Sequence, residues 1–144
     1  PAESVGALWA GMAGEVDTDV TLHTLWPERG GNGPLVLRLT YGSTSFTFGG
    51  DATALVEETL VARDGSNVRS SALLLARHGA KTASTTAFLQ AVAPEVVVIS
   101  AGDGAPDPTV LARVMDKPVY RTAVDGAVEL VSDGQRIQVI PTRR

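Results

Sequence analysis

Three residues of the chain carry side chains that could do chemistry: Asp51, His78 and Asp107. Each follows an apolar stretch or a loop and precedes a segment with helical periodicity. We therefore expect all three at the edge of an α/β sheet, where ligands usually bind. A carboxylate and an imidazole are suitable ligands for zinc or manganese, and a bridging carboxylate can hold two such ions about 3.5–4 Å apart. If the three side chains converge, they predict a metal site.

Each of these residues also has an ordinary structural interpretation. Asp51 and Asp107 stand at the start of candidate helices, and a proline follows Asp107, which is the pattern of a helix N-cap. A single histidine beside a glycine, as at His78, is common in a strand-to-helix turn. His23 lies in the middle of an alternating strand pattern and is not a candidate. The chain contains no GxSxG, Walker-type or HExxH motif, so serine hydrolase, nucleotide-binding and zincin functions have no support.

Composition excludes several further classes. A chain of 144 residues with 44% hydrophobic residues can form one domain with a core. The absence of cysteine excludes disulfides, thiolate metal sites and cysteine nucleophiles. A net charge of −4 argues against a broad basic surface for nucleic acid but leaves a local patch open. Apolar runs are far shorter than the ~20 residues of a membrane helix.

The chain begins with Pro rather than Met, so we expect it to be a fragment of a longer protein.

The elements that would position these residues follow from hydrophobic periodicity. Leu8, Trp9 and Met12 predict a short helix within residues 1–15, and alternation over 18–26 predicts a strand. The clearest signal is a hairpin over residues 35–48, because a Gly-Ser turn joins two strand-forming runs.

From residue 51 onward the pattern predicts alternating helices and strands. Leu55, Val56 and Leu60 would line the buried side of a helix that ends by Asp64-Gly65, and the Glu57-Glu58 pair would lie on its solvated face. A layered α/β sheet is the fold class that this order of elements favours. The remaining predicted segments are strands at 72–76 and 96–100, helices at 84–93 and 107–114, and short strands at 118–122, 127–131 and 136–140.

The order of these segments resembles a known family. LVLRLTYGSTSFTFGGDA, LLLARHGA, AFLQAVAPEVVVISAG, DPTVLARV and VYRTAVDGAVELVSDG resemble the later part of the metallo-β-lactamase-like domain of ComEC-type competence proteins, over about Leu35 to Gly134. The resemblance implies an αββα metallo-hydrolase fold in the soluble, extracytoplasmic domain of a bacterial inner-membrane DNA-uptake protein. It also implies DNA as a partner and metal-dependent nuclease activity. Asp51 matches the family's GDA aspartate, which is expected to bind or bridge metal, and His78 matches the second histidine of its HHGS motif.

The departures from the family pattern bear on activity. Arg77 replaces the first histidine of HHGS, Ala80 replaces its serine, and the family's GHP element is here 105–108, APDP, which leaves Asp107 but no imidazole. Ala123 replaces the aspartate that follows Arg-Thr, and the HxHxDH motif is absent. Since a dinuclear site needs several histidines and carboxylates, we expect this chain to bind no metal by itself, and to use zinc or manganese only if an upstream half completes it.

Three hypotheses remain open. The first is a degenerate or partial metallo-β-lactamase-like domain without hydrolase activity, and the second is the C-terminal half of an active nuclease whose HxHxDH half lies upstream. The third is a DNA- or protein-binding module that uses a local basic strip. The strip would consist of Arg63, Arg69, Arg77, Lys81, Arg113 and Arg121.

The apolar residues also predict how the sheet is covered. Helices should cover one face, and the alternating strands should expose Leu, Phe and Val side chains on the other. We expect the segment around Trp9 and Trp26, a second copy of the chain in a homodimer, or the missing N-terminal half to cover that face.

Overall fold

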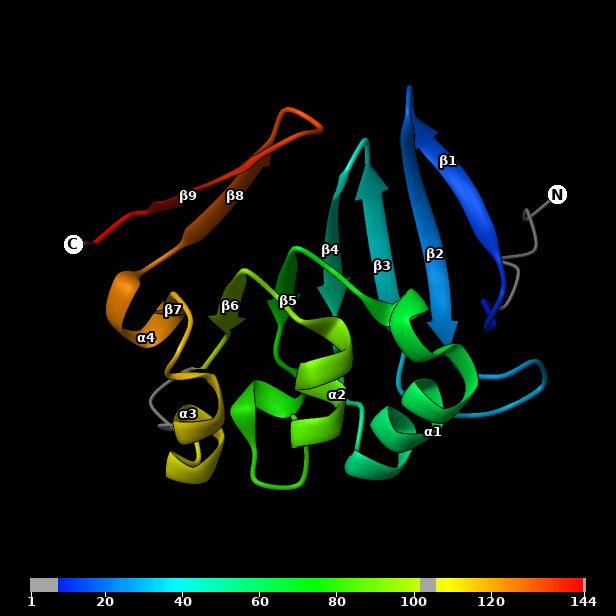
Figure 1. Cartoon of the computed structure of the whole chain (residues 1–144), viewed down its shortest axis with the longest axis horizontal. Helices are drawn as coiled ribbons and strands as arrows, with labels where there is room; N and C mark the ends of the chain where they lie inside the picture. Colours follow the sequence, from blue (N-terminus) through cyan, green and yellow to red (C-terminus); the bar gives the residue numbers. More distant parts are fainter. Residues whose placement is uncertain (1–7, 102–105, 144) are drawn as a thin grey trace, which may run out of the picture.

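The computed structural model describes residues 8–101 and 106–143. Its main element is a seven-stranded sheet in which the strands lie side by side in sequence order, from β1 to β7 (Figure 1). Strands β1 to β4 pair antiparallel, and strands β4 to β7 pair parallel. The structure therefore confirms a mixed α/β fold. The finer expectation of metallo-β-lactamase-like αββα layering stays a prediction.

The antiparallel half is a meander of four strands. Strand β3 joins β4 through the two-residue turn Gly42-Ser43, and Gly42 adopts a φ of 55° that favours glycine. The register places Leu39 opposite Phe46, so apolar side chains of adjacent strands share one face. The predicted hairpin is confirmed. The four strands are Ala13–Asp17 (β1), Val20–Trp26 (β2), Val36–Tyr41 (β3) and Thr44–Phe48 (β4).

The parallel half is built from strand–helix–strand connections, as parallel strands require. Its strands are short and mostly buried: Ala72–Leu74 (β5), Val96–Ile99 (β6) and Val119–Arg121 (β7). The connecting helices are Ala54–Asp64 (α1), Thr86–Val92 (α2) and Pro108–Val114 (α3), with short 3-10 turns at Gly65–Val68 (η1) and Ala76–Gly79 (η2).

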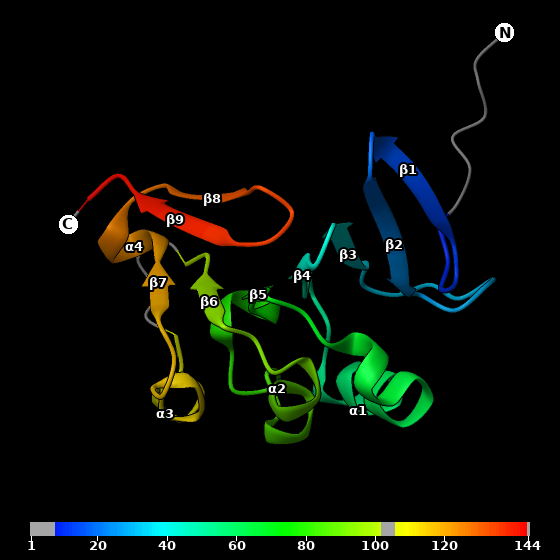
Figure 2. The same ribbon diagram turned by 45° about the horizontal axis from the view of Figure 1, so that its top comes forward.

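The main core lies between the sheet and these three helices, which cover one face (Figure 2). From the sheet, Leu73 and Ile99 are almost fully buried, and from the helices Leu60, Phe88 and Val110 are likewise buried. These positions follow the period-two and period-3.6 patterns of the sequence, so the expectation of helices on one face is confirmed.

A separate hairpin covers part of the opposite face of the sheet (Figure 2). After β7 the chain makes a single helical turn at Thr122–Asp125 (α4) and continues as β8 (Val128–Ser132) and β9 (Ile137–Pro141). The Ser43 N–H donates to the carbonyl of Gly134 at 2.7 Å, and the hydroxyls of Thr44 and Ser132 are 2.7 Å apart. The chain's own C-terminal hairpin therefore covers part of this face, which is not one of the three covers that the sequence predicts.

Three expectations about local structure are wrong. The N-terminal helix is absent from the described part of residues 1–15, because 13–17 form β1 and the glycines of this segment favour a turn; residues 1–7 lie outside the described range. Leu55 is 72% exposed rather than buried, because it lies outside the face of α1 that carries Val56 and Leu60. Trp26 packs against the main core on the helix side and therefore does not cover the open face.

Candidate functional site

The loops that hold the predicted site residues meet at the carboxyl edge of the parallel strands. The Arg77 N–H donates to the carbonyl of Gly50 at 2.8 Å, which joins the loop after β5 to the loop after β4. The Asp107 N–H donates to the carbonyl of Gly79 at 3.1 Å, which joins the same loop to the start of α3. Asp51, His78 and Asp107 therefore lie in three adjoining loops, as the sequence predicted.

Two glycines permit this close approach of the loops. A Cβ atom at Gly49 would lie 2.7 Å from the backbone nitrogen of Ala76, and one at Gly79 would lie 2.8 Å from the Cβ of Pro106. Gly79 also has a φ of 77°, in the left-handed region that favours glycine. The glycines of the GGDA and HGA segments thus have a packing role.

His78 is held in an unusual backbone conformation. Arg77 and His78 both have positive φ values, 50° and 56°, which cost a non-glycine residue on the order of 1 kcal/mol or more. The Nδ1 atom of His78 lies 2.5 Å from the carbonyl oxygen of Ser100. Because a carbonyl can only accept, Nδ1 carries the hydrogen, which leaves Nε2 as the ring nitrogen that could bind a metal. This is the arrangement that orients metal-binding histidines.

Asp107 acts as a helix cap. Its Oδ1 accepts hydrogen bonds from the hydroxyl and the backbone N–H of Thr109, the latter at 2.8 Å, and α3 begins at the next residue. These two bonds are the main cause that lowers the pKa of Asp107, and the positive charges of Lys81 and Arg113 lower it further. The capping interpretation of this residue is therefore confirmed.

Asp51 does not cap a helix, so that interpretation is wrong. The N-cap of α1 is Thr53, two residues further along, and Asp51 is exposed. Within residues 8–101 and 106–143 its side chain makes no hydrogen bond or ion pair. An exposed carboxylate at the sheet edge is compatible with a ligand position, but it needs partners.

Those partners are missing from the described part of the chain. No three His, Cys, Asp or Glu side chains among the described residues lie close enough to hold a metal ion. Arg77 is exposed beside His78 and contributes a positive charge that opposes the binding of a cation there. The donor set therefore does not fit a metal centre. The expectation that this chain binds zinc or manganese only when completed by other residues stays a prediction.

The sequence predicts that Glu57 lies on a solvated helix face, and this prediction is wrong. Glu57 is fully buried, and its two carboxylate oxygens accept hydrogen bonds at 2.7 Å from the backbone N–H groups of Ser84 and Thr85. Burial raises the pKa of Glu57, and the two N–H groups oppose that rise. Its position three residues before buried Leu60 places it on the inner face of α1, and that spacing was the available signal.

The basic residues do not form one strip. Arg77 and Lys81 follow β5 and lie at its carboxyl edge, whereas Arg69 precedes β5 and lies at its amino edge. Arg63 is held by Asp64 at the end of α1, and Arg113 donates to the carbonyl of Ser84 at 2.9 Å. Fewer basic residues therefore gather at the carboxyl edge than the sequence predicted.

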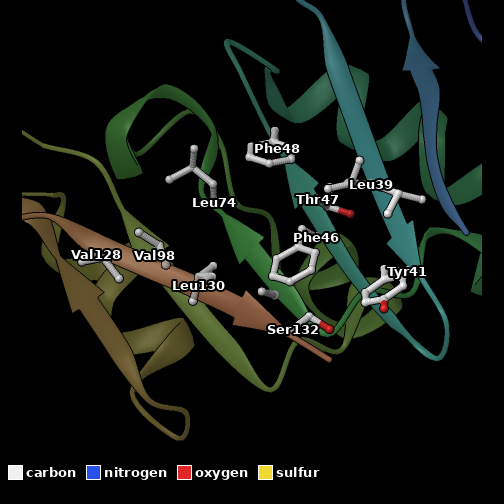
Figure 3. A pocket seen from close by; sticks show the side chains of 12 residues that line it. Leu39, Tyr41, Phe46, Thr47, Phe48, Leu74, Val98, Val128, Leu130 and Ser132 are labelled. Carbon is white, nitrogen blue, oxygen red and sulfur yellow. The ribbon is translucent and has the colours of Figure 1, made fainter. Parts of the chain in front are cut away.

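A second candidate site is an apolar groove of about 450 Å³ between β8 and the open face of the sheet (Figure 3). The sheet contributes Phe46, Phe48 and Leu74, and the hairpin contributes Val128 and Leu130. Phe48 is 40% exposed, so the hairpin covers this face only in part. The groove has the size of a ligand pocket but offers few polar groups to orient a ligand.

Comparison with known proteins gives one informative result. No family model matches the chain. Over 67 residues, 46% of its length, the chain is 42% identical to competence protein ComA of Neisseria gonorrhoeae. The match spans only 10% of that protein's length. The chain is thus related to a competence protein over part of its length. No helix in the described residues is long and apolar enough to cross a bilayer.

Proposed function

We propose that this chain is a degenerate or partial metallo-β-lactamase-like domain of a ComEC-type competence protein, which acts in DNA uptake and does not hydrolyse DNA by itself. The partial identity to a competence protein supports the competence role. The adjoining loops of Asp51, His78 and Asp107 support the domain assignment, since they meet at the sheet edge that the resemblance implies. By the same resemblance, the domain would lie on the extracytoplasmic side of the inner membrane.

The proposed absence of catalysis is inferred from the few side chains at this edge that could bind a metal. Asp107 is used as a helix cap, and Arg77 stands beside His78. Among the residues that the structure describes, what remains is one imidazole and one exposed carboxylate, which is too few for a hydrolytic metal centre. In this proposal the edge keeps the fold of a metallo-hydrolase but has lost its chemistry.

A working nuclease whose first half lies upstream is the second candidate. Two observations favour it: Nδ1 of His78 is bonded in the manner of a metal ligand, and the apolar groove leaves a sheet face that another layer could cover. A DNA-binding module is the third candidate, supported by the cations Arg77 and Lys81 at the same edge.

The test measures metal content and DNA cleavage of the purified chain. We expect less than one zinc or manganese ion per chain by elemental analysis, and no cleavage of single- or double-stranded DNA in either metal. Cleavage that disappears in His78→Ala would overturn the proposal in favour of the second candidate. The native sequence before Pro1 gives an independent check, because an intact HxHxDH motif there predicts an active domain.

A further inference from the structure

The amino edge of the parallel strands, opposite the loops of the candidate metal site, contains a small polar cavity of about 190 Å³. Its walls come from β3, from the turn and start of β4, and from the residues just before β5 and β6. They carry two guanidinium groups, several hydroxyls and one carboxylate: Arg38, Arg69, Ser43, Ser45, Ser70 and Glu95. The Ser43 hydroxyl donates to the Gly134 carbonyl at 3.0 Å, so the guanidinium groups are the main donors of the cavity. Two guanidinium groups in one cavity are typical of a site for an oxyanion.

Two buried polar atoms of these residues have no hydrogen-bond partner. Among the described residues, Arg38 Nε and Ser70 Oγ are buried and unpaired. Ser70 is only 2% exposed, and its backbone is fixed because its N–H donates to the carbonyl of Val92 at 2.9 Å. A buried donor without a partner costs roughly 1–3 kcal/mol, and both residues line the cavity, so a ligand that enters it could relieve part of this cost.

The guanidinium groups in the cavity make no ion pair with any described residue. Within residues 8–101 and 106–143, no carboxylate lies within 4.0 Å of Arg38 or Arg69, although Glu95 lines the same cavity. One nitrogen of Arg38 donates to the Asn67 carbonyl at 2.9 Å, which holds the side chain in place. Burial lowers the pKa of Arg38. A partly buried cation with no anion beside it is costly, and a bound anion would relieve that cost.

We propose that this cavity binds a phosphate group, held by the guanidinium groups of Arg38 and Arg69 and by the hydroxyl of Ser70. A phosphate has several oxygens, which can accept from the fork of an arginine and from a hydroxyl at the same time. The group comes either from a free phosphate or from a nucleic acid. The proposal goes beyond the proposed function, and its failure leaves that function untouched because the two sites lie at opposite sheet edges.

The whole chain is titrated with inorganic phosphate at constant ionic strength, and the backbone amide chemical shifts are measured by NMR at each phosphate concentration. We expect saturable shifts at Ser43, Ser45 and Ser70. In Arg69→Ala the affinity should fall about tenfold, the loss of one charge-assisted hydrogen bond. Arg69 is exposed, so this variant should fold; Ser70→Ala gives a second test that leaves the charge unchanged.

Two further variants separate a built site from general charge. Arg77→Ala makes the same charge change at the opposite edge and should leave phosphate affinity unchanged. Glu95→Gln removes the carboxylate of the cavity and should tighten binding. The proposal is overturned if phosphate gives no saturable shift, if Arg69→Ala binds as the native chain does, or if Arg77→Ala weakens binding equally.

Oligonucleotides distinguish the two sources of the phosphate. A single-stranded oligonucleotide with a 5′-phosphate should compete with free phosphate at the same amides. If the same oligonucleotide without its 5′-phosphate also competes, the cavity accepts a backbone phosphodiester, and if it does not, the cavity takes a terminal phosphate. If neither oligonucleotide competes while free phosphate binds, the source is a small phosphate. All three results support the site, provided that competition is lost in Arg69→Ala.

Discussion

Glu57 in α1 accepts a hydrogen bond at 2.7 Å from the backbone N–H of Ser84, a buried residue with a left-handed φ of 56°. The carbonyl of the same Ser84 accepts from Arg113 of α3 at 2.9 Å. Two charged side chains from different helices therefore fix one peptide segment at the start of α2. This segment ends the loop that begins at His78, so Glu57 anchors the far end of that loop.

The first prediction concerns Glu57→Gln. A glutamine amide can accept only through its oxygen, so one of the two backbone N–H groups faces an NH₂ group instead of an acceptor. We expect the free energy of unfolding to fall by about 1–3 kcal/mol. Urea unfolding measures it, with Glu58→Gln as the exposed neighbour for comparison. Equal stability of both variants would contradict the assigned role.

Glu57 also predicts a pH dependence. Burial raises its pKa above the ordinary value of 4.5, so the folded chain holds this proton more tightly than the unfolded chain. The contribution of Glu57 to stability is therefore fully present below pH 4.5 and declines as the pH rises toward its folded pKa. The difference in unfolding free energy between the native chain and Glu57→Gln should shrink over that window, and a constant difference would disprove the shift.

The second prediction concerns Gly79. An alanine there must adopt a positive φ and also place its Cβ 2.8 Å from that of Pro106. Gly30 has nearly the same φ, 78°, but no atom within 4 Å of the added Cβ. Both substitutions should cost about 1 kcal/mol for the backbone, and Gly79→Ala should cost clearly more. Thermal melts of the two variants give the comparison. Equal midpoints would mean that the loops are not in close contact.

The third prediction concerns Asp51 and His78. Since Asp51 is exposed and caps no helix, Asp51→Ala should change the unfolding free energy by no more than about 0.5 kcal/mol. His78→Ala should cost more, because it leaves the Ser100 carbonyl without its donor. Neither effect should change when a chelator is added. A chelator-dependent melt of the native chain would instead indicate a bound metal.

The fourth prediction tests how the C-terminal hairpin is attached. The Ser132 hydroxyl is 2.7 Å from that of Thr44 and accepts from the Gly134 N–H at 2.9 Å. Ser132→Ala should lower the unfolding free energy by about 1 kcal/mol, whereas Ser66→Ala on the exposed η1 turn should be near neutral. Hydrogen exchange at the Ser43 amide, which bonds to Gly134, should become faster only in the first variant.

The parts of the fold that sequence reasoning predicted are those set by local patterns. The Gly42-Ser43 turn, the alternation around it, and the Asp107 cap before Pro108 each depend on neighbours in the chain. The errors have the opposite origin. The sequence predicts a solvated position for Glu57 because its hydrogen-bond donors, the backbone N–H groups of residues 84 and 85, are far away in sequence.

The sequence predicted where the candidate site lies but not the structural role of each of its residues. The sheet edge follows from strands that precede Asp51 and His78, and parallel pairing brings these loops together. Pro108 marks Asp107 as a helix cap, whereas no local feature shows that α1 is capped by Thr53 rather than by Asp51. The phosphate cavity was invisible in the sequence, because its arginines and serines come from three segments joined only by strand pairing.

The sequential order of the seven strands affects how the chain is made. Each strand pairs with the one synthesised just before it, so no strand has to insert between two that are already paired. The sheet can therefore grow in one direction while the ribosome is still translating. The cost is that every intermediate ends in an open edge able to pair with another chain.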